Sequence, residues 1–326
     1  MEDALRLSGL TKIFAGSGKN AVTAVDSLDL VIPHGSVYGF LGRNGAGKTT
    51  ALKMIAGLCR PTAGEICIYG NKAQFGKPMC YKNIGYLPDV PEFYPYMTAR
   101  EYLFLCGRLH KMPERDIKKK IAEIFEQINF DKKRLGSKIS GFSRGMKQKL
   151  GIAASLINSP DLIMLDEPTS ALDPIGRKET INIMDSLRGK HTVVFSTHIL
   201  NDVEKVCDHI ALIEKGALVL EGGINDIKSK YSGLCESLCI EAAASGAEGY
   251  GKFAEAAKAL EYISDVELTL EETAKIRLKT SDRKKAGETL PKIICESGLS
   301  LIKFEFEDAD LEDIFISATS KERGEE

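Results

Sequence analysis

Residues 36–56 decide the fold. They read SVYGFLGRNGAGKTTALKMIA, an apolar run followed by a glycine-rich loop and a helical pattern. The loop matches G-x-x-x-x-G-K-[ST] in full, in the strand-loop-helix context that this pattern requires. Its glycines let backbone N–H groups turn inward around phosphate oxygens. The stretch predicts an α/β fold with a phosphate-binding loop. The residues expected to hold the phosphates are Gly42, Arg43, Asn44, Gly45, Ala46, Gly47, Lys48, Thr49 and Thr50.

Two side chains at the end of this loop are expected to contact a bound nucleoside triphosphate and its metal ion. Lys48 should reach the β and γ phosphates, and the Thr49 hydroxyl should ligate Mg²⁺. A glycine-rich turn that meets the pattern by chance is the alternative. The apolar strand before the loop and the helix after it argue against that alternative.

A second functional stretch is the apolar run at 162–165, which ends in Asp166 and Glu167. The carboxyl ends of buried parallel strands face the ligand crevice of an α/β sheet. Asp166 is therefore expected to hold Mg²⁺, and Glu167 to act as general base on the attacking water. Two surface acids after a strand would look the same, but they would not be expected to accompany a phosphate loop.

A third stretch, FSRGMKQKLGIAASL at 142–156, predicts a helix from Lys147 onward. Ser143 stands like an N-cap with Gly145 beside it, and no acidic residue is near. A helix start with free N–H groups, a hydroxyl and a glycine is suited to bind an anion. The chain already has a phosphate loop about a hundred residues earlier. This second anion site therefore needs a ligand from another source.

The rest of the chain divides into three regions of different pattern. Residues 1–32 are rich in predicted strands, and residues 90–156 predict a mostly helical insert. Continuous apolar strands alternating with helices predict a parallel sheet covered on both faces. We place the end of the first domain at 222 and a linker at 223–233. Residues 234–326 then predict a small α+β domain of βαββαβ, ferredoxin-like order, followed by a short helix at 311–320.

Composition and charge exclude several classes of protein. The chain has 326 residues, 43% hydrophobic and 28% charged, so a packed core is expected rather than disorder. The net charge of −2 argues against nucleic acid as a partner. The eight cysteines form no CxxC pair and indicate reduced thiols, and a metal pair of Cys235 and Cys239 would lack a second pair. No signal peptide or run of about 18 apolar residues is present, so a membrane role would need a partner chain.

The phosphate loop, the strand that ends in Asp166 and Glu167, and the Ser-x-Gly helix start together resemble the ATP-binding subunits of ABC transporters, over residues 4–222. FSRGM aligns with that family's signature, usually LSGGQ. The resemblance implies a P-loop NTPase of the ABC type with an antiparallel β subdomain and a helical insert. It also implies that Ser143 and Gly145 bind the γ-phosphate of ATP held by a second chain. Two ATP molecules would then lie between two chains packed head to tail.

Further positions match the family. The resemblance implies that Phe14 stacks on adenine, that His198 contacts the γ-phosphate, and that the loop 170–173, which includes Ala171, crosses to the partner chain. Two departures stand out. Arg144 and Met146 replace the usual Gly and Gln of the signature, and Asp89 stands where most relatives have a glutamine that contacts Mg²⁺. An aspartate can still ligate Mg²⁺.

The resemblance implies an ATPase that drives a separate, multi-span membrane permease. The signature departures and the C-terminal extension resemble the drug, antibiotic and sodium exporter branch. The expected partners are a second copy or a homologous ATPase chain, and a permease that holds this chain at the cytoplasmic face of the membrane. Two alternatives remain: a member of the family acting on ribosomes or DNA, and a nucleotide-dependent regulatory module whose sensor is the C-terminal domain. A single glycine loop and the lack of heptads argue against the first.

Overall fold

The computed structural model divides the chain into two compact units, Met1–Ile224 and Asn225–Glu326. The range expected as a linker, 223–233, instead contains helix α7 (Ile224–Tyr231). Ile224 and Ile227 are 7% and 3% exposed, so apolar burial at helical spacing explains why this segment folds. The structure describes residues 3–15, 21–170, 172–231, 236–244, 248–270, 274–307, 311–312 and 314–315.

The centre of the first unit is a six-stranded sheet of order β10-β9-β3-β8-β7-β6. Five strands are parallel, and β10 pairs with β9 in the antiparallel sense at one edge. Every residue of β3, β7 and β8 is buried, as their continuous apolar sequences predict. The strands are β3 (Val37–Leu41), β6 (Ile84–Leu87), β7 (Leu162–Asp166), β8 (Thr192–Thr197), β9 (His209–Glu214) and β10 (Ala217–Gly223).

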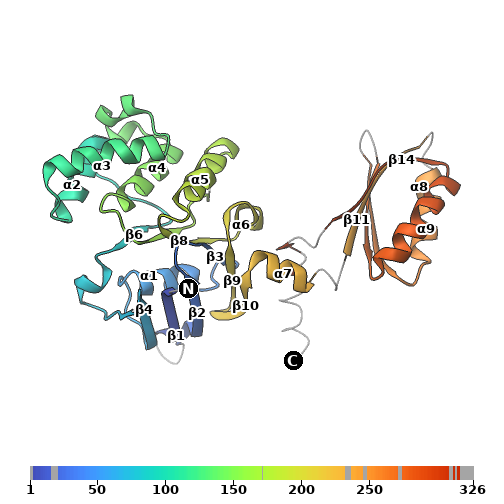
Figure 1. Ribbon diagram of the computed structural model, residues 1–326, viewed down its shortest axis with the longest axis horizontal. Helices are drawn as coiled ribbons and strands as arrows, with labels where there is room; N and C mark the ends of the chain where they lie inside the picture. The colour runs from blue at the N-terminus through green and yellow to red at the C-terminus, as the bar shows by residue number, and fades with distance from the viewer. Residues whose placement is uncertain are drawn as a thin grey trace. The chain divides into compact units, whose positions relative to one another are not determined.

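Helices cover both faces of this sheet (Figure 1). Helix α1 (Lys48–Ile55) packs between it and the antiparallel sheet, in a core that includes Leu52, Phe40 and Leu7. Helices α5 (Pro174–Leu187) and α6 (Leu200–Val206) lie on the opposite face. The phosphate loop and the strand ends are thereby fixed on a rigid base.

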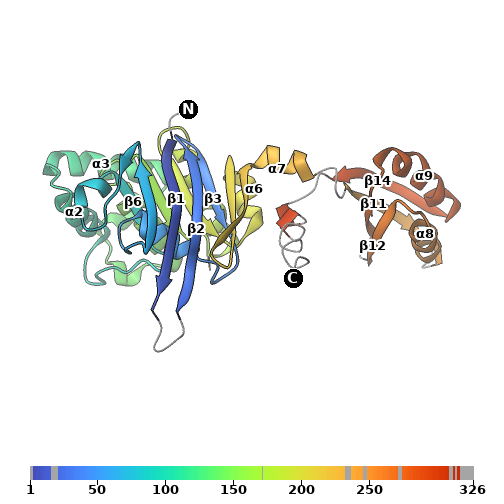
Figure 2. The same ribbon diagram turned by 90° about the horizontal axis from the view of Figure 1, so that it is seen from below.

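The antiparallel subdomain is a four-stranded sheet of order β2-β1-β4-β5. Its two longest strands, β1 (Asp3–Phe14) and β2 (Val22–Pro33), run side by side along the first unit (Figure 2). Alternate residues such as Leu28, Leu30 and Ile32 are buried towards α1. The shorter strands are β4 (Ala63–Ile68) and β5 (Asn71–Lys72).

The helical insert contains α2 (Ala99–Leu109), α3 (Glu114–Gln127) and α4 (Arg144–Ser155). Short 3₁₀ turns lie at 78–81, 132–136 and 139–141. The capping box predicted at the start of α2 is present: Thr98 and Glu101 hydrogen-bond each other's backbone N–H.

Helix α4 begins at Arg144, three residues before the position predicted from its apolar pattern. The Ser143 hydroxyl accepts a hydrogen bond from the Met146 N–H at 3.3 Å and caps the helix early. The polar residues that follow are therefore helical although they carry no apolar periodicity. The signature stretch lies on the first turn of a formed helix.

The second unit is a four-stranded antiparallel sheet of order β12-β13-β11-β14, with α8 and α9 on one face (Figure 1). This is the strand order of a ferredoxin-like βαββαβ unit. Its core includes Ile240, Phe253, Leu278 and Leu290. The elements are β11 (Glu236–Ala244), α8 (Glu248–Lys258), β12 (Ile263–Leu270), β13 (Ala274–Thr280), α9 (Arg283–Glu296) and β14 (Leu299–Glu307).

The expectations about membrane-spanning helices and cysteines can be compared with the described part of the chain only. No helix there is long and apolar enough to cross a bilayer. The cysteines it contains are all free thiols, whereas Cys235 lies outside the described residues. Most of the short helix expected at 311–320 also lies outside them.

Gly85 on β6 sets how closely α4 approaches the sheet. A Cβ at this position would lie 2.2 Å from the carbonyl oxygen of Ser155, the last residue of α4, and 3.0 Å from Pro160 Cγ. We expect Gly85→Ala to lower the free energy of unfolding by about 1–3 kcal/mol through overpacking, measured by urea denaturation. Gly136→Ala is the control, because among the described residues nothing lies within 4 Å of its added Cβ. Equal stability of the two variants would contradict the packing argument.

Candidate nucleotide-binding site

The phosphate loop joins β3 to α1 through backbone conformations that only glycine adopts easily. Gly45 and Gly47 have φ of 85° and 106°. A Cβ on Gly47 would lie 2.3 Å from the carbonyl oxygen of Ala24. Gly47 is the N-cap of α1, and in the described structure no side chain caps this helix start. Its first N–H groups are thus available to phosphate oxygens.

Lys48 lies folded under this loop, with 5% of its surface exposed. Its Nζ donates hydrogen bonds to the carbonyl oxygens of Gly42 at 2.7 Å and Arg43 at 3.3 Å. The same Nζ is 3.3 Å from Glu167 Oε1. A buried ammonium group requires such partners, and here the main one is the predicted general base.

Asp166 is 1% exposed and holds the end of β7 to its neighbours. Its Oδ1 accepts hydrogen bonds from Thr49 Oγ1 at 3.0 Å and Ser196 Oγ at 2.6 Å. The Ser196 hydroxyl also accepts one from the Glu167 N–H at 2.9 Å. Sequence reasoning missed Ser196. The signal was its place in the apolar strand that pairs with β7, directly opposite Asp166.

Glu167 is held in a strained conformation between two basic side chains. Its φ is 46°, in the left-handed region that a non-glycine residue rarely occupies. One carboxylate oxygen, Oε1, faces Lys48, and the other, Oε2, is 3.0 Å from His198 Nδ1. The side chain is 11% exposed. Strain and burial of this kind are typical of functional residues.

Tyr86 on β6 is a second residue that sequence reasoning did not single out. Burial raises the pKa of its hydroxyl well above the usual value, and the negative charges of Asp166 and Asp89 raise it further. The hydroxyl is buried and has no hydrogen-bond partner within the described part of the chain. Tyr86 therefore stays protonated beside the acidic groups of the site.

The oxygen donors present are suited to Mg²⁺. Thr49 donates a hydrogen bond to Asp166, and Thr49 and Asp89 line one cleft. The described residues contain no group of three His, Cys, Asp or Glu side chains that could hold a metal alone. Mg²⁺ is commonly coordinated by one or two protein oxygens, and phosphate oxygens and water complete its coordination shell. The oxygen donors of Thr49, Asp166 and Asp89 fit this mode of coordination.

These side chains meet in one cleft of about 310 Å³. It brings together most of the predicted phosphate loop with Asp89, Glu167 and His198. The residues that line it are Ala24, Arg43, Asn44, Gly45, Ala46, Gly47, Lys48, Thr49, Thr50, Asp89, Glu167, Ser170 and His198.

Five predicted site residues are not among the lining residues of this cleft: Phe14, Gly42, Ser143, Gly145 and Asp166. Gly42 and Asp166 contact it through Lys48 and Thr49, which they hydrogen-bond. Phe14 ends β1 with 45% of its surface exposed, and Lys12 Nζ lies 4.9 Å from its ring centroid. Ser143 is exposed, and Gly145 is partly exposed near Leu172. Ala171 of the crossing loop lies outside the described residues. The roles of these residues stay predictions.

Comparison with known proteins identifies the class. A family model described as ABC transporter matches residues 25–170. The chain is 34% identical to an uncharacterized ABC transporter ATP-binding protein, YxlF of Bacillus subtilis, over 90% of this chain and 93% of the relative. The chain therefore belongs to the ATP-binding proteins of the ABC transporter family.

Two relatives have names that mention an antibiotic. The bacitracin transport ATP-binding protein BcrA of Bacillus licheniformis is 39% identical over 71% of this chain and 73% of the relative. The linearmycin resistance ATP-binding protein LnrL of Bacillus subtilis is 29% identical over 92% of this chain and 94% of the relative. These names support the exporter branch that the signature and the C-terminal extension predicted.

A similar solved structure supports ATP hydrolysis as the reaction. The chain resembles the dimeric, post-hydrolysis ATP-binding cassette MJ0796 bound to ADP and Pi, with a TM-score of 0.62 and 26% identity over 68% of this chain and 98% of that one. The predictions of a P-loop fold, of ATP as ligand and of ATP hydrolysis are confirmed. This chain is an ABC-type ATPase subunit, and its homologues dimerise and work with transmembrane permease components.

The two hydrogen bonds of Ser196 generate a prediction. Ser196→Ala should lower the free energy of unfolding by about 1–3 kcal/mol, because buried Asp166 loses a donor and the Glu167 N–H loses its acceptor. It should also lower kcat for ATP, since both carboxylates lose their fixed position. Ser155→Ala is the matched control: that hydroxyl is also buried but bonds only the Ile152 carbonyl. Equal kcat in the two variants would exclude a role for Ser196 in the site.

Proposed function

We propose that two copies of this chain, or this chain and a homologue, close head to tail around two ATP molecules and drive a separate membrane permease that exports an antibiotic. One observation carries the catalytic part. Lys48, Glu167 and His198 converge on one cleft, whereas Ser143 and Gly145 lie apart from it. Each cleft then needs the signature helix of another chain to complete it.

The Lys48–Glu167 ion pair suggests how the nucleotide starts the reaction. Phosphate oxygens entering the loop would attract Lys48 Nζ, which now contacts Glu167 Oε1 at 3.3 Å. Oε1 is then free to accept a proton from the attacking water, while His198 Nδ1 keeps the carboxylate oriented through Oε2. Thr49, Asp166 and Asp89 would hold Mg²⁺, which neutralises charge on the phosphates. ADP and phosphate are the products.

The permease is proposed to dock on the exposed apolar side chains that lead from Asp89 into α2. Val90, Tyr94 and Tyr96 are 64%, 50% and 66% exposed. A groove of about 540 Å³ follows, lined by Tyr96, Met97, Arg100, Glu101, Phe104, Leu105 and Arg108. Exposed aromatic side chains beside a groove are typical of interaction sites. Asp89 belongs to the same segment and lines the nucleotide cleft. A movement of Asp89 on nucleotide binding can therefore be transmitted along this segment to the permease.

The proposed cargo class comes from the relatives. Bacitracin and linearmycin occur in the names of two of them. An antibiotic exporter places this chain at the cytoplasmic face of the membrane, where ATP is found, with the permease as its anchor. Cargo contacts belong to the permease, so this chain supplies energy rather than specificity.

Glu167→Gln tests the catalytic assignment. The amide cannot accept a proton from water, so hydrolysis should fall by about 100-fold or more. ATP should still bind, and the variant should accumulate as an ATP-bound dimer in light scattering after gel filtration. Glu126→Gln, an exposed change on α3, should hydrolyse ATP normally. A Glu167→Gln protein that turns over at the control's rate, and stays monomeric with ATP, would refute the mechanism.

Tyr96→Ala tests the docking face. Loss of this exposed ring should reduce recovery of a multi-span membrane chain when tagged protein is pulled down from detergent-solubilised membranes. ATP hydrolysis by the isolated chain should not change, because Tyr96 does not line the nucleotide cleft. Val22→Ala, which removes a side chain of similar exposure on β2, should leave the recovery intact. Equal recovery with both variants would remove Tyr96 from the interface.

A further inference from the structure

A buried carboxylate outside the nucleotide cleft connects the chain segments that carry Glu167 and His198. Asp202 on α6 is 0% exposed, yet it does not line the cleft. Its Oδ2 accepts a hydrogen bond from Thr169 Oγ1 at 2.6 Å, and its Oδ1 accepts one from Arg177 Nε at 2.6 Å. Burial of a charged group is costly unless it is paired, so each of these contacts matters.

The two partners of Asp202 come from the segments that follow β7. Thr169 is two residues after Glu167 and is 1% exposed. Within the same turn, the Ser170 N–H donates to the Glu167 carbonyl at 3.1 Å, and the Leu172 N–H donates to that of Thr169 at 3.4 Å. The Thr169 side chain therefore fixes the turn in which Glu167 has its strained φ of 46°.

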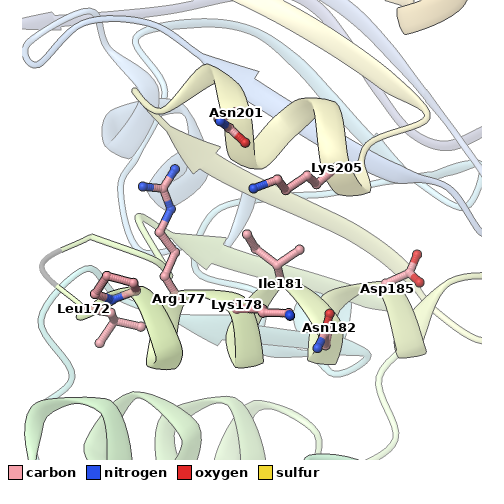
Figure 3. Close-up of a pocket in the computed structure, with 9 residues that line it drawn as sticks. Leu172, Arg177, Lys178, Ile181, Asn182, Asp185, Asn201 and Lys205 are labelled. Carbon is pink, nitrogen blue, oxygen red and sulfur yellow. The ribbon is translucent and has the colours of Figure 1, made fainter. Parts of the chain in front are cut away.

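Arg177 extends the link to α5. Its side chain reaches from α5 towards α6 at a groove of about 680 Å³, where Asn201 and Lys205 of α6 face Ile181 and Asp185 of α5 (Figure 3). Asp173, at the end of the loop 170–173, caps α5 by accepting from the Gly176 N–H at 2.8 Å. Asp173 is thus fixed to α5, and through Arg177 to Asp202.

The third segment is the one that carries His198. Asp202 lies four residues after His198, in the helix that follows β8. The Asp202 N–H donates to the carbonyl oxygen of Ile199 at 3.2 Å. One carboxylate therefore joins the turn of Glu167, the helix after the loop 170–173, and the segment of His198.

We propose that Asp202 is a positioning residue. Through Thr169 it sets the orientation of Glu167 relative to His198, and through Arg177 it makes that orientation depend on the position of α5. A shift of α5 is passed to the general base without any contact with nucleotide. The proposal rests on the catalytic role of Glu167 proposed above.

Thr169→Val is the test, because it removes the hydroxyl, keeps the shape, and leaves the Asp202–Arg177 ion pair. We expect kcat for ATP to fall about 10-fold or more, since a small misplacement of a catalytic group is costly. KM and ATP affinity should not change. Thr169→Ser should restore kcat. Thr180→Val is the matched control: Thr180 is also 1% exposed, and its hydroxyl bonds only the Gly176 carbonyl of its own helix.

A second measurement separates positioning from general loss of structure. Single-turnover hydrolysis is compared for Glu167→Gln with and without Thr169→Val. If Thr169 acts through Glu167, adding Thr169→Val should change the residual rate by less than about twofold. Full activity of Thr169→Val, equal losses in Thr169→Val and Thr180→Val, or a further loss in the Glu167→Gln background would each overturn the proposal. Undiminished hydrolysis by Glu167→Gln alone would instead refute the catalytic role of Glu167.

Discussion

Parallel pairing of β3, β8 and β7 is the constraint on which the site depends. The three strands are buried throughout and end at one edge of the sheet, so the phosphate loop, Glu167 and His198 emerge side by side although they are far apart in sequence. The hydrogen bond from Ser196 to Asp166 ties the ends of β8 and β7 together. Catalytic geometry here is largely a consequence of sheet register: a slip of one residue would turn Asp166 and Ser196 to opposite faces.

Lys48 and Glu167 already form an ion pair before any nucleotide arrives. Lys48 and Glu167 are 5% and 9% exposed, and Lys48 Nζ lies 3.3 Å from Glu167 Oε1. A triphosphate brings its own negative charge and competes with Glu167 for the lysine. In the proposed mechanism, nucleotide binding and activation of Glu167 are therefore linked by exchange of one ion-pair partner, with no need for a large movement of the backbone.

Sequence alone predicted what is contiguous in the chain and missed what is assembled by folding. The phosphate loop, Asp166 and Glu167 could be predicted to lie together because each motif is contiguous in the chain, and the strand-helix order predicted the α/β fold. The side-chain contacts of Ser196 and Asp202, and the proximity of Tyr86 to Asp166, could not be predicted, since they join segments 25 or more residues apart. Helix α7 was expected as a linker because two buried isoleucines in a polar segment give a weak periodic signal. The early start of α4 followed from a single cap.

The exposed start of α4 supports the proposal that hydrolysis depends on the pairing of two chains. Ser143 and the first turn of α4 have the features of an anion site, yet they contribute nothing to the cleft of their own chain. A chain that supplies the base in one place and the anion-binding helix start in another can complete two sites only by pairing with a second chain. The contacts of Asp202 are made on the side of the site that carries Glu167. They connect the turn of Glu167 to α5, the helix that Asp173 caps. In the proposed mechanism, nucleotide binding frees the base through the Lys48 ion-pair exchange, and closure of the pair then adds the anion-binding helix start of the second chain.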